Sequence, residues 1–179
     1  MPMRQEMRVE WTSYSSPVGP LTVVEAPAGP LIVEYPARAA AVRWTVRMNG
    51  VTPRIEAEEG ECAATRAWLD DYFDGRPRRF PFPRYLARWF DVTPAQLAVF
   101  RALRRIPLGE TRSYDQIARI TGLHARQIGQ CLAANHLAIL IPCHRVVGKD
   151  GSLVGYGGGI NRKRWLLGHE SRRTGVVLR

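Results

Sequence analysis

The chain has 179 residues, of which 45% are apolar, so it is long and apolar enough to bury a core and is not expected to be disordered. No apolar run approaches the roughly 20 residues that a membrane span needs, and the first residues lack the apolar core of a signal peptide, so we expect a soluble intracellular protein. Residues 1–92 carry 12 basic and 12 acidic side chains, whereas residues 93–179 carry 14 basic and four acidic ones, so the net charge of +10 lies entirely in the second half. This asymmetry favours a polyanionic partner for that half.

The first part of the chain has the short alternating segments and intervening turns that are typical of β-strands. The candidate strands are Val9–Ser13, Leu21–Glu25, Leu31–Tyr35 and Val42–Met48. From Glu61 onward apolar residues recur at helical spacing, and Gly75 with Pro77 just after it predicts the end of that helix. We therefore predict a small N-terminal α/β domain with an antiparallel sheet over residues 1–75.

The second part of the chain is predicted to be mostly helical. Residues 76–92 are rich in Pro and Arg and predict a linker, after which residues 93–179 form the second domain. Thr93 and Ser113 each begin a capping-box pattern, and the second pattern opens a short helix to about Ile120. A glycine-containing turn and a further helix from about Ala125 to Ala134 follow, which together form a helix-turn-helix pattern. Its position in the basic half of the chain supports this interpretation, because a helix-turn-helix that binds nucleic acid is expected to be basic.

The last part of the chain predicts a loop and one more helix. The segment Gly148–Gly159 is rich in glycine and predicts an irregular loop or wing. Arg162–Leu167 then predicts a final helix.

The chain has three cysteines, an odd count without regular spacing, which argues against a disulfide framework. No CxxC occurs and the four histidines do not fall at zinc-site spacing from the cysteines, so we expect no metal site. Cys62 and Cys131 are interpreted as small buried apolar residues. Cys143 is different, because it stands between a proline and a histidine after an apolar run, in the sequence ILIPCHRVV.

A thiol that follows proline is expected to be presented on a rigid turn. A nucleophilic cysteine needs thiolate character, which a nearby cation or base supplies, and His144 and Arg145 are the local candidates. We expect Glu170, on the last helix, to orient the imidazole as the third member of a nucleophile–base–orienter set. Coincidence remains the alternative interpretation of an isolated Cys-His pair.

The run Ile141–Val147 closely resembles the active-site motif of the O6-alkylguanine-DNA alkyltransferases, and the likeness extends to other segments in the same order. These segments are Pro107–Ala118, Ala125–Asn135, Gly155–Gly159 and Trp165–Glu170. The resemblance covers about residues 93–170 and is weaker before them. The order and spacing of several separate motifs make it specific.

The resemblance implies an α+β fold with a ribonuclease H-like N-terminal domain and a winged helix-turn-helix in the C-terminal domain. It implies that one alkyl group is transferred, once and without cofactor or metal, from O6-alkylguanine in DNA to the thiol of Cys143. The same transfer is expected to extend to O4-alkylthymine. The implied partner is double-stranded DNA that carries the lesion, bound by a monomer, and the implied location is the cytoplasm or nucleoid. Cooperation between neighbouring molecules on DNA stays open.

The resemblance also implies roles for the residues around the thiol. His144 and Glu170 form a water-bridged relay that deprotonates Cys143, and Tyr114 sits near N3 of the flipped base, where a phenol can help to protonate the leaving guanine. Asn135 binds the turn before the cysteine and joins it to the recognition helix. The alternative interpretations are a helix N-terminal core residue for Tyr114 and a helix C-cap for Asn135.

Further implied roles concern DNA and the substrate pocket. Arg126 enters the base stack in place of the flipped nucleotide, and its alternative is a solvated helix arginine that contacts phosphate. The helix enters the minor groove, which favours small residues for close approach. Those small residues are Ala125, Gly129 and Ala133, with Ala134 beside them. The implied pocket residues, besides Tyr114, are Val146, Tyr156, Gly157 and Gly158.

Two departures from the family pattern stand out. Gly157 occupies a place where many members carry a hydroxyl side chain, so only its backbone N–H could contact O6. The N-terminal half lacks the Cys and His residues that hold a structural zinc in some members. A related group of non-catalytic DNA-binding proteins has lost the cysteine, whereas this chain keeps it.

Three other functions were weighed. The main alternative is a protein that flips and flags alkylated bases without transfer. A sequence-specific regulator would need polar base-reading side chains along Ala125–Asn135, which is rich in Ala and Gly. A thiol hydrolase does not account for the basic half.

Overall fold

The computed structural model describes residues 6–41, 54–76, 80 and 92–175. The chain divides into two compact units, Met1–Thr93 and Pro94–Arg179. Most of the segment 76–92, predicted to be a linker, lies outside the described residues, as does the predicted strand Val42–Met48. Among the described residues, no helix is both long and apolar enough to cross a membrane.

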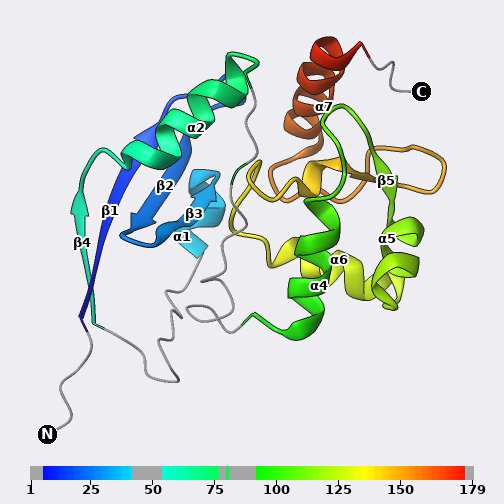
Figure 1. The fold of residues 1–179 in the computed structure, drawn as a ribbon, viewed down its shortest axis with the longest axis horizontal. Helices are drawn as coiled ribbons and strands as arrows, with labels where there is room; N and C mark the ends of the chain where they lie inside the picture. The colour runs from blue at the N-terminus through cyan, green and yellow to red at the C-terminus, as the bar shows by residue number, and fades with distance from the viewer. Residues whose placement is uncertain (1–5, 42–53, 77–79, 81–91, 176–179) are drawn as a thin grey trace, which may run out of the picture. The chain divides into compact units, whose positions relative to one another are not determined.

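The first unit contains a four-stranded sheet in the order β3-β2-β1-β4 (Figure 1). Its strands are β1 (Glu6–Tyr14), β2 (Leu21–Ala26), β3 (Gly29–Glu34) and β4 (Arg54–Glu59). The three predicted strands in the described residues are confirmed, and β1, β2 and β3 pair antiparallel as expected. The fourth strand, β4, pairs parallel with β1, which the prediction of an antiparallel sheet did not include.

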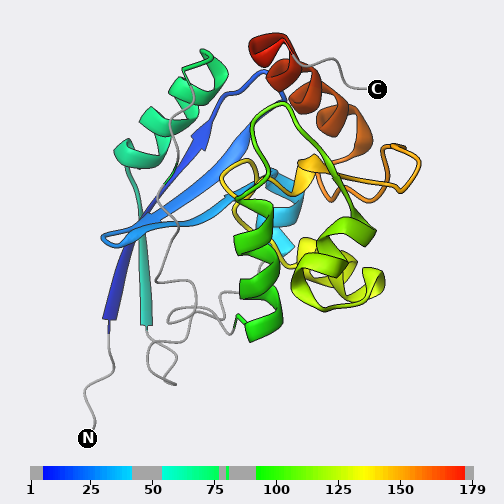
Figure 2. The same cartoon turned by 45° about the vertical axis from the view of Figure 1, so that its right-hand side comes forward.

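Each face of this sheet packs under a helix. Along β1, Met7 and Val9 are buried toward one face, in a cluster that Ala39 of the short helix α1 (Pro36–Ala41) joins. Thr12 and Tyr14 point to the other face, because side chains alternate along a strand. There the Tyr14 hydroxyl donates a 2.7 Å bond to Asp70 of helix α2 (Ala63–Phe73), which Figures 1 and 2 show lying along the sheet.

The helix-turn-helix pattern of the second unit is confirmed. The helices are α4 (Pro94–Leu103), α5 (Tyr114–Thr121), α6 (Ala125–Ala133) and α7 (Ile160–Thr174). Ser113 and Gln116 make both bonds of a capping box at the start of α5. Gly122 ends α5 in the left-handed conformation, with φ of 71°, which glycine adopts without steric cost. Helices α4, α5 and α6 pack on one another, whereas α7 lies apart from them in both views (Figure 2).

The reactive segment of the second unit lies between α6 and α7. Cys143–Arg145 form a single 3₁₀ turn, and the next two residues form β6 (Val146–Val147). This strand pairs parallel with β5 (Arg112–Ser113), directly before α5. The glycine-rich segment that follows is irregular, as predicted, whereas α7 is longer than the predicted Arg162–Leu167 and so includes Glu170.

Candidate active site

Cys143 opens the 3₁₀ turn at the end of a buried apolar run. Its backbone N–H donates a 2.7 Å bond to the carbonyl of Ile141, and the N–H of Val146 closes the turn on the Cys143 carbonyl. Cys143 is half-buried, whereas Cys62 and Cys131 are buried. Burial raises the pKa of Cys62 to about 11 and also raises that of Cys131, which disfavours their thiolates. Cys143 is therefore the accessible thiol of the three.

The turn before Cys143 contains a strained residue. Ile139 has φ of 70°, a left-handed conformation that a β-branched side chain rarely adopts, and it is buried. Such a conformation persists only where the surrounding structure holds it. Here the carbonyls of Leu137 and Ala138 accept bonds from the N–H groups of Ile141 and Leu140.

Asn135 joins the end of the recognition helix to this turn. Its Nδ2 donates to the carbonyl of Ile141 at 2.9 Å and to the sulfur of Cys143 at 3.2 Å, and its Oδ1 accepts from the N–H of Leu137 at 3.0 Å. The side chain is buried. Asn135 therefore fixes the backbone before the nucleophile and also contacts the nucleophile itself, which sequence reasoning did not include.

His144 and Glu170 form a buried pair next to the thiol. The imidazole Nε2 lies 2.7 Å from a carboxylate oxygen of Glu170, and both side chains are fully buried. Burial lowers the pKa of His144 although the carboxylate of Glu170 opposes the shift, so the ring is neutral at neutral pH. If Nε2 carries the proton that Glu170 accepts, Nδ1 has a free lone pair. This Nδ1 is buried and has no hydrogen-bond partner among the described residues.

Arg145 also binds Glu170, from the outer side. Its Nε and one terminal nitrogen donate to the two carboxylate oxygens at 2.8 and 2.9 Å, and the other terminal nitrogen donates to the carbonyl of Ile106 at 2.7 Å. The N–H of Gly109 donates a further bond to Glu170 at 3.2 Å. Burial alone raises the pKa of Glu170, but the His144 and Arg145 groups that bind it hold this pKa well below its usual range. Glu170 is therefore a fixed anion.

Tyr114 begins α5 and reaches toward the glycine-rich loop. Its hydroxyl donates to the carbonyl of Gly155 at 3.3 Å. A Cβ at Gly155, where φ is 56°, would lie 2.7 Å from that hydroxyl, so glycine permits this close approach. Burial raises the pKa of Tyr114 and the nearby Cys143 sulfur raises it further, so the phenol keeps its proton at neutral pH. Tyr114 is therefore bonded to the loop that follows the Cys143 turn.

The other predicted pocket residues lie on β6 and the loop after it. Val146 and Gly158 are buried, Tyr156 is half-buried and Gly157 is exposed. They follow Cys143 within one continuous stretch of chain.

Lys163 is a buried residue at the site that sequence reasoning missed. Its ammonium donates to the carbonyl of Val146 at 2.5 Å and to that of Val154 at 2.7 Å. A signal was present in the sequence, because Lys163 shares one helical face with Leu166, Leu167 and Glu170, all of which are buried. A lysine on a buried helix face needs a partner.

The predicted DNA-contacting residues share the exposed surface of α6. Ala125 and Ala133 are exposed and Gly129 is half-buried, and their spacing of four residues places them on one helical face. A Cβ at Gly129 would meet nothing within 4 Å, so packing within the protein does not require glycine there. Arg126 is exposed and makes no ion pair within the described part of the chain.

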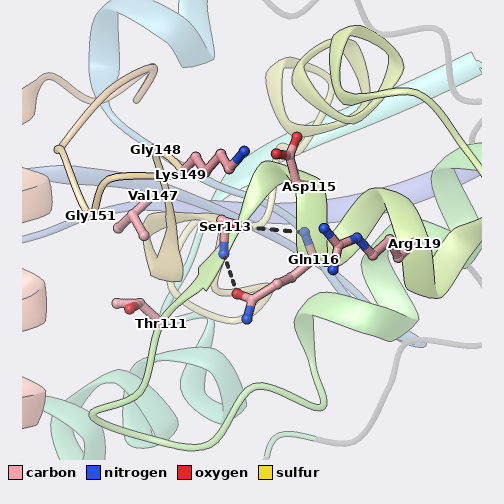
Figure 3. A pocket seen from close by; sticks show the side chains of 9 residues that line it. All are labelled: Thr111, Ser113, Asp115, Gln116, Arg119, Val147, Gly148, Lys149 and Gly151. Carbon is pink, nitrogen blue, oxygen red and sulfur yellow. Dashed lines mark hydrogen bonds between the residues drawn. The ribbon is translucent and has the colours of Figure 1, made fainter.

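A cavity of about 370 Å³ lies between the start of α5 and the end of β6 with the loop after it. Figure 3 shows Ser113 and Gln116 joined by their capping bonds, with Lys149 and Arg119 to either side in this view. Both cations are exposed and form no ion pair among the described residues, and Asp115 also lines the cavity. Neither Cys143 nor Tyr114 lines it. Its charge suits contact with an anionic group next to the site rather than the chemistry itself.

Within the described ranges, no group of three or more His, Cys, Asp or Glu side chains is placed to bind a metal ion.

The sequence of the second unit matches a known family model. Residues 94–172 match the DNA-binding domain of 6-O-methylguanine DNA methyltransferase. The match includes the reactive turn, both helices of the helix-turn-helix and Glu170.

Similar proteins cover nearly the whole chain. The methylated-DNA–protein-cysteine methyltransferase of Salmonella typhimurium is 49% identical in an alignment that covers 92% of this chain and 96% of that protein. The protein of the same name from Mycobacterium bovis is 38% identical over 93% of this chain and 94% of its own length. The structure of Mycobacterium tuberculosis OGT in complex with DNA is similar, with a TM-score of 0.71, 33% identity and coverage of 93% and 94% of the two chains.

Proposed function

Because the chain belongs to the family of methylated-DNA–protein-cysteine methyltransferases, we propose that it removes alkyl groups from O6 of guanine and O4 of thymine in duplex DNA, acting as a monomer. Enzymes of this family repair DNA by transferring an alkyl group to one of their own cysteines. The acceptor is the sulfur of Cys143. The observation that carries this assignment is the arrangement around that sulfur, which is accessible and bonded by Asn135, next to a buried His144–Glu170 pair.

The first step is activation of the thiol. The neutral imidazole of His144 takes the proton of Cys143 through Nδ1 and a bridging water, and Glu170 stabilises the resulting charge through its bond to Nε2. Glu170 stays ionised because Arg145 and the Gly109 N–H also bind it.

The second step is displacement. The sulfur attacks the alkyl carbon, the bond from that carbon to O6 breaks, and the electron pair of that bond stays on the base. The protonated phenol of Tyr114 donates to N3 of the leaving guanine and so disperses its negative charge. The proton taken from Cys143 balances the one that guanine gains. A thioether has no route back to the thiol, so each chain reacts once.

The target base must leave the helix, because O6 is not reachable inside a duplex. Unstacking costs a few kcal/mol, and a side chain inserted in place of the base offsets part of that cost. Arg126 is exposed on α6 and has no ion pair to give up within the described residues, which fits this role. The small residues of α6 allow close approach to the minor groove.

Substrate range is tested with a panel of duplexes that carry O6-methylguanine, O6-benzylguanine or O4-methylthymine. We expect each to lose its alkyl group in a ratio of one per protein chain, because the thioether formed on Cys143 does not return to the thiol. The measurement is chromatography of the digested DNA after reaction with excess protein. Recognition of the base without transfer would instead leave every lesion intact while the protein still binds.

Binding to the phosphates flanking the lesion is expected to involve the cavity of Figure 3. Replacing Arg119 and Lys149 together with alanine should weaken duplex binding uniformly and reduce the slope of log K against log salt by about 1.8, or ~0.9 for each lost phosphate contact. The measurement is fluorescence anisotropy over a salt series. The control is Arg8→Ala, which removes a cation that is 80% exposed in the first unit. An unchanged slope in the double variant would exclude this cavity from the DNA interface.

A further inference from the structure

The ionised sulfur of Cys143 needs a positive charge nearby, and the adjacent arginine does not supply it. All three nitrogens of the Arg145 guanidinium are bonded, two to Glu170 and one to the carbonyl of Ile106. Its charge therefore balances the carboxylate of Glu170. His144 is neutral before the reaction, because burial lowers its pKa.

Lys163 is a buried cation that is bonded to the turn carrying the sulfur. It is fully buried on α7, and its ammonium donates to Val146, the residue that closes the Cys143 turn, and to Val154 of the glycine-rich loop. These acceptors are neutral carbonyls and not carboxylates. No ion pair satisfies the charge of Lys163 among the described residues, although a buried lysine ordinarily has one.

The electrostatic coupling between Lys163 and Cys143 acts in both directions. Burial lowers the pKa of Lys163 to about 8, and the Cys143 sulfur opposes that shift. The other ionisable groups around the sulfur are Tyr114, which keeps its proton, and the His144–Arg145–Glu170 set, whose charges bind one another. At neutral pH the amine of Lys163 is therefore mainly protonated, and its charge has no anionic partner until Cys143 ionises.

We propose that Lys163 is a positioning residue of the transfer reaction, whose ammonium provides the positive charge that favours the ionised Cys143 sulfur while its two carbonyl bonds hold the chain around that sulfur. The inference rests on the proposed function for its biological meaning. The thiol chemistry that it describes is a property of the free protein and needs no DNA.

The test is the pH dependence of Cys143 alkylation by iodoacetamide in the full-length protein, followed on the Cys143 peptide by mass spectrometry. In Lys163→Met and in Lys163→Gln, the midpoint of the rate profile should rise by about one pH unit or more, because a nearby cation lowers a thiol pKa by that amount. The rate at neutral pH should fall about tenfold. Lys163→Arg, which keeps the charge, should hold the midpoint closer to that of the unmodified protein than either neutral variant does.

The matched control is Arg164→Met, which removes an exposed cation from the same helix and should leave the midpoint unchanged. If Lys163→Met does not fold, Lys163→Gln carries the test because its amide can still donate to a carbonyl. An unshifted midpoint in either folded neutral variant would overturn the proposal. Failure of the proposed function would appear separately, as a normal iodoacetamide profile with no transfer from alkylated DNA.

Discussion

Replacing Cys143 with alanine should abolish alkyl transfer while leaving the affinity for duplex DNA within about twofold of the original, because phosphate contacts supply most of that affinity. We expect the single-turnover rate to fall by at least about 10³-fold, since no other residue at the site can accept the alkyl group. The measurements are transfer of a labelled methyl group to protein and anisotropy of a labelled duplex.

Cys131→Ala is the matched control for this variant. Cys131 lies on the recognition helix and is buried, and burial raises the pKa of its thiol, so its loss should leave the transfer rate nearly unchanged. Transfer that survived in Cys143→Ala, or that disappeared in folded Cys131→Ala, would contradict the assignment of Cys143 as the alkyl acceptor.

Replacing Glu170 with glutamine should have the largest effect on stability. The neutral amide leaves the buried guanidinium of Arg145 without its anion, and breaking a buried pair in this way costs about 3–5 kcal/mol. The melting temperature should fall by roughly 10 °C. Transfer should slow by at least about 10²-fold, because His144 loses the group that orients and supports it as a base. Thermal unfolding and single-turnover kinetics measure the two effects.

Glu110→Gln provides the same chemical change in an exposed ion pair. Glu110 lies 2.9 Å from Arg112, and the two side chains are 39% and 37% exposed. Exposed pairs contribute at most about 1 kcal/mol, so this control should melt within a few degrees of the original protein. Equal losses in the two variants would contradict the structural role given to the buried carboxylate.

Glu170 and His144 determine how the stability of the folded protein changes with pH. The folded-state pKa values of Glu170 and His144 both lie below the unfolded ones, so the folded state binds fewer protons than the unfolded state in acid. The stability that these two shifted pKa values contribute is fully present above about pH 6.5. It declines as the pH falls below that value, where His144 is protonated in the unfolded chain, and declines further below about pH 4.3, where Glu170 is protonated in the unfolded chain. Glu170→Gln should lose the steeper part of this decline.

Much of the second unit could be predicted because its signals are local. The capping box at Ser113, the turn at Gly122 and the proline before Cys143 each act within a few residues, and the structure has helix ends or turns there. Motif order led to the correct family, and the fold agrees with it. Glu170 was expected to orient His144 as the third member of a nucleophile–base–orienter set, and the resemblance implied the same pair, although a loop and most of α7 separate the two residues.

The parts that could not be predicted depend on contacts between distant segments. Strand β4 has the sequence RIEAEE and was not predicted, because its charged residues do not resemble a typical strand. Such charges are common on an edge strand, which is the position of β4 in the sheet. Helix α7 continues past the predicted end at Leu167, because the burial of His169 and Glu170 favours continuation of the helix. Arg145 was a candidate cation for the thiol, and only the fold shows that Glu170 binds it and that Lys163 is bonded to the residue that closes the Cys143 turn. The short helix α1 was also missed, although Pro36 stands at its first position, where proline is common.

Intact-mass and peptide analysis after reaction with duplex O6-methylguanine DNA tests the alkyl acceptor most directly. The predicted product is a chain that has gained a single methyl group, carried by the peptide that contains Cys143, together with DNA in which the lesion has become guanine. A folded protein that binds the duplex yet gains no mass, or that carries the methyl group on Cys62 or Cys131, would contradict the assignment.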